Sequence, residues 1–249
     1  LTQISLKYKY YIRLSYLGTH YHGWQIQPNG ITIQEVIQDK ISVVLREKIE
    51  LTGCGRTDAG VHARNFVAHF ESSQPLNETA FCQKINKFLP EDIAVHEIKK
   101  ASMNFHARFD ATKRTDRYYI VTEKDPFSTD KAWLHTNPLS IEAMNDAASV
   151  LSEYSDFTSF AKIHTDVKTH NCKIYHAEWK QEGKFLIFEI SADRFLRNMV
   201  RAIVGTLVDV GKGKVDMEEF NAIIKGKDRS LAGTSAPACG LFLEEIEYK

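Results

Sequence analysis

The residues best suited to chemistry lie in one short loop, residues 53–64. The loop carries a carboxylate, Asp58, two residues after Arg56, and three glycines accompany them. Glycines allow the backbone to turn tightly and allow a ligand to come close to it. A carboxylate on such a loop, directly after a predicted strand, can act as a nucleophile or as a base. An aspartate that only forms a hydrogen bond within its own turn explains the same pattern about equally well.

A predicted helix over residues 195–210 supplies a second charged group. Nearly all of its side chains are apolar, which indicates burial, yet Arg197 and Arg201 lie one turn apart on one face. A buried guanidinium needs an anionic partner, because an unpaired charge in the interior is costly. The partner could be a carboxylate such as Asp58, a phosphate of a ligand, or both in turn. Alternatively, this face is exposed and water solvates both arginines.

Two further segments, residues 16–27 and 105–119, combine aromatic side chains with cationic or hydrogen-bonding ones. Between positions 99 and 131 there are eight lysines and arginines against five aspartates and glutamates. Interleaved cations and rings suit phosphate contacts together with the stacking of bases. Each segment taken alone is more often ordinary core with solvated charges, so the RNA-binding interpretation depends on finding both together.

The composition is that of a folded protein with no excess of either charge. Among 249 residues, 43% are hydrophobic, and 32 lysines and arginines balance 32 aspartates and glutamates. A chain with zero formal charge can bind nucleic acid only through a local basic patch. No apolar stretch approaches the ~18 residues that cross a membrane, and no signal peptide is recognisable. We therefore expect a cytoplasmic protein without membrane contact.

Metal and nucleotide sites are poorly supported. The four cysteines are far apart and form no CxxC pair, so neither a zinc site nor disulfide bonds are expected. A dinucleotide-binding GxGxxG motif would need a glycine where Asp58 stands, and a P-loop would need serine or threonine where Gly213 stands.

The apolar spacing predicts an α+β protein whose two halves each contain a mostly antiparallel sheet with helices packed on it. We expect an N-terminal domain over residues 1–104, which carries the Asp58 loop, and a C-terminal domain over residues 105–249, with a cleft between them as the default site. Strands are predicted at 8–16, where apolar side chains alternate, and at 51–54, 66–70, 93–98, 117–122, 172–179, 185–190 and 241–248. A short turn at Glu182–Gly183 predicts that strands 172–179 and 185–190 form a hairpin. Helices are predicted from Thr32 to Leu45, at 80–89, from Ser140 to about Leu151, at 195–210 with Gly211 just past its end, and after Asp216. Thr32 with Glu35, and Asp216 with Glu219, have the spacing of a capping box.

Several motifs occur together in a fixed order, and the set resembles the tRNA pseudouridine synthase A family. The matching motifs span about residues 10–245, nearly the whole chain. They include Gly55-Arg-Thr-Asp-Ala-Gly-Val-His-Ala63, Tyr21-His-Gly-Trp-Gln25, Phe105-His-Ala-Arg-Phe109, Asp156-Phe-Thr-Ser-Phe160 and Gly240-Leu-Phe-Leu243.

This resemblance implies a fold, a reaction and a substrate. The two halves would form one extended antiparallel sheet with a central active-site cleft. The enzyme would isomerise uridine to pseudouridine in the anticodon stem-loop of tRNA, at tRNA positions 38 to 40, without metal or organic cofactor and as a homodimer. The family's catalytic aspartate matches Asp58, which would attack C1′ or remove the 2′ proton. Its buried arginine matches Arg201, a partner for Asp58, and Arg56 would contact the target nucleotide or help to evert it.

The sequence departs from the family at one position that would bind substrate. The family usually has a tyrosine that stacks on the target uracil where this chain has Asp116, and only the second tyrosine of that motif is kept, as Tyr118. Either the strand shifts so that Tyr118 or Tyr119 reaches the base, or stacking worth roughly 1–3 kcal/mol is weakened. A catalytically weak tRNA-binding protein on the same scaffold is therefore an alternative function, and a synthase acting on another RNA is a third.

Overall fold

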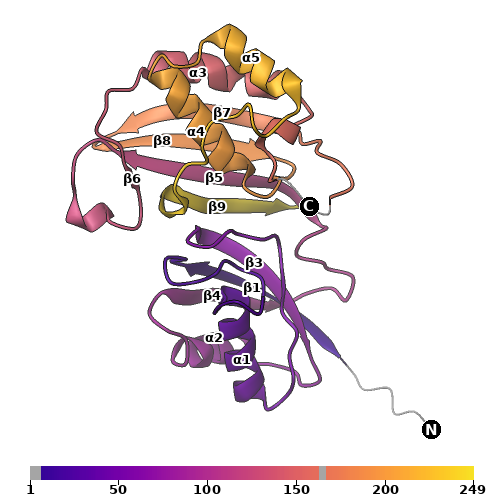
Figure 1. Ribbon diagram of the computed structural model, residues 1–249. Coiled ribbons are helices and arrows are strands. Elements are labelled where there is room, and N and C mark those ends of the chain that lie inside the picture. The colour runs from indigo at the N-terminus through magenta and orange to yellow at the C-terminus, as the bar shows by residue number, and fades with distance from the viewer. Residues whose placement is uncertain (1–6, 163–166) are drawn as a thin grey trace. The chain divides into compact units, whose positions relative to one another are not determined.

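A computed structural model describes residues 7–162 and 167–249. Within these ranges the chain forms five α-helices and nine strands, in two compact units (Figure 1). Unit 1 comprises Leu1–Thr112 and Glu244–Lys249, and unit 2 comprises Lys113–Leu243. In the described part of the chain, no helix is both long enough and apolar enough to span a bilayer.

Unit 1 is built around strand β1, where alternating side chains point into the core. Tyr10, Ile12, Leu14 and Tyr16 are all buried, so the predicted alternation is confirmed. The strand pairs antiparallel with β3 on one side and with β4 on the other, and β2 pairs with β3. The bounds are β1 (Tyr8–Tyr16), β2 (Thr52–Gly53), β3 (His62–Ser72) and β4 (Ile93–Lys100).

Two helices bury their apolar stripes within unit 1, α1 (Ile33–Leu45) and α2 (Glu78–Asn86). The predicted start of α1 is confirmed, because the Thr32 side chain accepts a hydrogen bond from the Glu35 backbone and so caps the helix. Helix α2 is capped in the same way by Asn77. The caps and apolar stripes together place both helices against the sheet (Figure 1).

Unit 2 combines strands β5, β8 and β7, paired antiparallel in that order, with three helices. The predicted hairpin between β7 and β8 is confirmed, and Gly183 in its turn has a φ of 57°. Strand β6 pairs with β5 in parallel. The bounds are β5 (Ala111–Val121), β6 (Trp133–Leu134), β7 (Ile174–Glu182), β8 (Phe185–Ala192), α3 (Ile141–Ser149), α4 (Met199–Gly211) and α5 (Met217–Gly226). Strand β9 (Leu241–Tyr248) begins in unit 2 and ends in unit 1.

Helix α4 is buried nearly all round, as its composition predicts, but both of its ends differ from the expected ones. It begins at Met199 rather than at residue 195, because Asn198 adopts a left-handed conformation with a φ of 65°. Gly211 is the last helical residue rather than a residue past the end. A Cβ atom there would lie 2.4 Å from Met144 Sδ, so this glycine permits close packing against α3.

The division between the units lies at 112/113, whereas the sequence predicted 104/105. Residues 105–110 stay with unit 1 because hydrogen bonds attach them to it. The Ala107 backbone N–H donates to His69 Nδ1 at 3.1 Å, and its carbonyl accepts from the Tyr248 hydroxyl at 2.7 Å. The α+β class and the mostly antiparallel pairing are confirmed, and the cleft between the halves stays a prediction.

Candidate active site

The loop predicted to carry chemistry connects β2 to β3 within unit 1; we call residues 54–61 the catalytic loop. Asp58 is half-buried and Arg56 is exposed. The Asp58 carbonyl accepts a hydrogen bond from the Val61 backbone at 3.1 Å. Gly60, with a φ of 79°, provides the left-handed residue that this turn requires. The carboxylate therefore lies on a tight turn that remains partly open to solvent.

The segment 16–24 braces the catalytic loop from one side. Trp24 donates its backbone N–H to the Thr57 carbonyl at 3.2 Å, and Gly60 donates to the Tyr21 carbonyl at 3.3 Å. The Tyr16 hydroxyl shares a hydrogen bond of 2.9 Å with Thr57 Oγ1. Because Thr57 immediately precedes Asp58, these contacts fix the backbone from which the carboxylate extends.

Two glycines make this close approach possible. Gly23 has a φ of 83°, and a Cβ atom on it would lie 2.3 Å from the Thr57 carbonyl oxygen. A Cβ atom on Gly18 would lie 2.0 Å from the Val61 carbonyl oxygen. The sequence predicted a recognition surface in this segment, whereas the structure gives its backbone a bracing role that was missed. Its two glycines were the available signal.

Two further hydrogen bonds fix the segment 16–24, which we call the brace. The Gly18 backbone donates to His62 Nδ1 at 2.9 Å, so this nitrogen acts as an acceptor. The Tyr21 hydroxyl donates to Asp92 Oδ1 at 2.7 Å, and burial, together with this carboxylate, raises the pKa of Tyr21. Tyr21 therefore stays a protonated donor at neutral pH.

Arg201, on α4 of unit 2, is half-buried, whereas Arg197 is exposed. The alternative of solvated arginines therefore fits Arg197 alone. The Arg201 Nε donates to the Ala236 carbonyl at 2.8 Å, and the Ala236 backbone donates to the Arg201 carbonyl at 2.9 Å. This pair of bonds fixes the base of the arginine side chain. Since Arg201 and Asp58 belong to different units, their pairing stays a prediction.

Strand β5 places Asp116 and Tyr118 on one side of the strand, and both are buried. Tyr118 is fully buried, and its hydroxyl donates to the Pro237 carbonyl at 2.7 Å. Burial raises the pKa of Tyr118. The register of β5 with β8 is regular from Arg114 to Val121 and shows no shift. Tyr118 is thus a core residue in this structure, and contact of either residue with substrate stays a prediction.

Among the residues in the described ranges, no three His, Cys, Asp or Glu side chains gather closely enough to hold a metal ion. Three polar side chains of the catalytic loop are at least partly exposed: Asp58, Arg56 and Thr57, which offer a carboxylate, a guanidinium and a hydroxyl. This set can supply a nucleophile or base beside a cation that binds an anionic ligand.

Comparison with known proteins finds matches in both units. A family model described as tRNA pseudouridine synthase matches residues 13–110 and 153–249. The tRNA pseudouridine synthase A of Bacteroides fragilis is 54% identical over 242 residues, which is 96% of each chain. That of Parabacteroides distasonis is 51% identical over 241 residues, again 96% of each chain. That of Geobacter sp. strain M21 is 40% identical over 238 residues, or 94% of this chain and 96% of the other.

Proposed function

The chain belongs to the tRNA pseudouridine synthase A family, and we propose that Asp58 is the residue on which its reaction depends. The chain is an isomerase that converts uridine to pseudouridine in the anticodon stem-loop of tRNA. The observation that supports the role of Asp58 is its placement on a turn braced at Thr57 and Gly60 yet partly open to solvent.

The reaction exchanges one bond at C1′ for another. The N1–C1′ bond breaks, the uracil rotates, a C5–C1′ bond forms, and the proton on C5 is lost while N1 gains one. The Asp58 carboxylate attacks C1′ as uracil leaves and is itself displaced when C5 attacks, or it removes the 2′ proton to give a glycal. Both routes need an ionised carboxylate held at the sugar.

Two arginines assist in this proposal. Arg201 pairs with Asp58, and its positive charge favours the ionised carboxylate. Arg56 contacts the phosphate of the target nucleotide or helps the base to leave the stack, which otherwise costs a few kcal/mol. Support comes from the exposure of Arg56, two residues before Asp58, and from the backbone bonds that fix the base of the Arg201 side chain.

Asp116 and Tyr118 complete the proposed substrate-binding residues. We place Asp116 beside the target uracil, where it cannot stack as a tyrosine would, whereas the fully buried Tyr118 supports the strand that carries Asp116. A tRNA-binding protein of low catalytic activity is the second candidate function, and the buried carboxylate of Asp116 favours it. As the full assembly, we propose a homodimer that acts on tRNA in the cytoplasm.

The test measures tritium release from a tRNA transcript labelled at C5 of uridine, since pseudouridine formation displaces that atom. We expect release by the parent without added cofactor and none by Asp58→Asn. Asp39→Asn, at an exposed position on α1, is the matched control and should release tritium at the parental rate. If neither the parent nor the control releases tritium but both bind tRNA tightly, the second candidate function replaces the first.

A further inference from the structure

A large aromatic ring is exposed at the end of the segment formed by residues 101–110, which we call the FHARF segment. Phe109 exposes 74% of its surface. Its ring centroid lies 4.2 Å from that of His106, with 33° between the ring planes. The guanidinium carbon of Arg108 lies 5.8 Å from the Phe109 centroid. A largely exposed ring therefore lies beside both an imidazole and a cation.

Local hydrogen bonds fix the backbone turn that carries this ring. The backbone N–H groups of Arg108 and Phe109 both donate to His106 Nδ1, at 3.2 and 3.3 Å. The His106 backbone donates to Asp110 Oδ2 at 2.8 Å, and the Asp110 backbone donates to the His106 carbonyl at 3.1 Å. The turn is thus closed upon itself, so a ligand that binds Phe109 orders little additional backbone.

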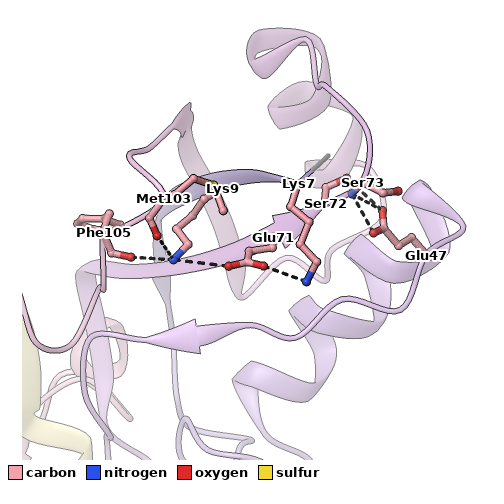
Figure 2. A network of polar contacts seen from close by, with 8 residues as sticks. All are labelled: Lys7, Lys9, Glu47, Glu71, Ser72, Ser73, Met103 and Phe105. Carbon is pink, nitrogen blue, oxygen red and sulfur yellow. Dashed lines mark hydrogen bonds and ion pairs between the residues drawn. The ribbon is translucent and has the colours of Figure 1, made fainter. Parts of the chain in front are cut away.

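The FHARF segment is also attached to the sheet of unit 1. The Lys9 ammonium donates to the carbonyls of Met103 at 2.7 Å and of Phe105 at 3.2 Å, and Figure 2 shows both contacts. Lys9 also pairs with Glu71 at 3.6 Å, and Lys7 approaches the same carboxylate at 3.1 Å. The segment is therefore fixed to β1 and, through Ala107 and His69, to β3.

From this arrangement we propose that Phe109, with Arg108 beside it, is a stacking platform for one unpaired base of the RNA substrate; this inference rests on the proposed function. Every nucleobase presents a flat π-face that stacks on an aromatic ring, and an adjacent guanidinium can stack on the base or contact its phosphate. The patch suits a base better than a protein, because Met103 is the one other large hydrophobic residue of the segment that is strongly exposed. Protein interfaces need a much wider apolar core.

The first test measures the affinity of the full chain for unmodified tRNA. Phe109→Ala should weaken binding about tenfold to a hundredfold, the range for loss of one stacked base. Phe109→Tyr should bind as the parent does, and Phe109→Leu should bind as weakly as the alanine variant, because the ring is required and not apolar bulk. Phe127→Ala is the matched control: Phe127 is even more exposed, at 87%, but in the described ranges no cation or other ring lies against it. Its affinity should equal that of the parent.

The second test identifies the base. Each unpaired position of the tRNA is made abasic in turn, and each RNA is bound to the parent and to Phe109→Ala. At one position the abasic site should weaken binding to the parent by about the same factor as Phe109→Ala does, and should not weaken the variant further. Equal losses in both proteins at every position would overturn the proposal. So would a change of oligomeric state in Phe109→Ala by light scattering, since the ring would then bind a second copy of the chain.

These measurements separate the inference from the proposed function. Coupling between Phe109 and one base is read from binding alone and requires no catalysis. If the parent releases no tritium but Phe109 is still coupled to one base, the proposed catalytic role of Asp58 fails and the stacking platform stands. If Phe109→Ala binds tRNA as tightly as the parent and releases tritium normally, the stacking platform fails and the proposed catalytic role of Asp58 stands.

Discussion

The catalytic loop and the FHARF segment are both irregular segments of unit 1, yet they are held by opposite means. The catalytic loop is held by another backbone, that of residues 16–24, which approaches so closely that Gly18 and Gly23 have no room for a side chain. The FHARF segment is held by side chains, among them those of Lys9 and His69, that bind its backbone groups. The first arrangement should tolerate no added side chain at Gly18 or Gly23, whereas the second should lose its contacts one at a time.

The largest expected effect is that of Gly23→Ala, which would break the close approach. The new Cβ atom would lie 2.3 Å from the Thr57 carbonyl oxygen, at a φ of 83° that alanine disfavours. We expect a loss of about 3 kcal/mol or more in the free energy of unfolding, measured with urea, and a collapse of kcat. Gly55→Ala, in the catalytic loop itself, meets no atom within 4 Å and should stay within about 1 kcal/mol of the parent. If Gly23→Ala and Gly55→Ala are equally stable, the close approach of the two backbones is not what holds the catalytic loop.

Acid should weaken the FHARF segment through His69. Burial, with the nearby charges of His106 and Lys9, lowers the pKa of His69 from 6.5 to about 4. The unfolded chain therefore takes up this proton first, and stability should fall by up to about 3 kcal/mol as the pH drops from 6.5 to 4. His69→Gln keeps an acceptor for the Ala107 backbone but cannot titrate. Its unfolding free energy, followed by urea titration at each pH, should fall less steeply than that of the parent, and equal slopes would rule out His69 as the cause.

Removing one side-chain anchor should have a smaller effect. Lys9→Met removes the ammonium that binds the Met103 and Phe105 carbonyls and should cost about 1–2 kcal/mol of stability. Lys7→Met removes an exposed partner of Glu71 and should cost less than about 1 kcal/mol. If the two variants unfold at the same urea concentration, the carbonyl contacts of Lys9 contribute nothing.

A small change in stability is expected from Tyr16→Phe, which removes one hydroxyl from the brace. Loss of its hydrogen bond to Thr57 should cost about 1 kcal/mol. Because that bond orients Asp58, kcat should fall about tenfold while KM stays near the parental value. Tyr11→Phe is the control, because Tyr11 lies on the same strand as Tyr16 but donates its hydroxyl to Glu97, at 2.5 Å. This variant should leave kcat unchanged. A parallel fall of kcat in both variants would indicate a general loss of folding rather than loss of positioning.

Local patterns in the sequence predicted local structure well. The cap at Thr32, the capping box from Asp216 to Glu219 and the turn at Gly183 each depend on residues only a few positions apart, and all three are confirmed. The chemistry of these residues acts on their own backbone, so no knowledge of the remaining fold was needed.

Features that depend on distant partners could not be predicted in the same way. Gly211 suggested a helix end, but its small size serves the contact with Met144 of α3. The left-handed turn at Asn198 delays the start of α4, and its only signal in the sequence is that asparagine tolerates this conformation better than most residues. For the site, the sequence singled out Asp58, but it could not reveal that Tyr16 and Gly23 hold its loop, because that contact joins segments far apart in the chain.

Unit 1 is discontinuous, and this has a consequence for how the protein is made. Its last part, Glu244–Lys249, is translated only after all of unit 2. The Tyr248 hydroxyl then binds the Ala107 carbonyl, Thr112 binds the Glu247 carbonyl, and Arg64 pairs with Glu244. A ribosome that has finished unit 2 therefore still carries an incomplete unit 1 with the Asp58 loop already synthesised. Nascent chains that stop short of residue 244 should lack these contacts, so completion of unit 1 coincides with completion of translation through β9.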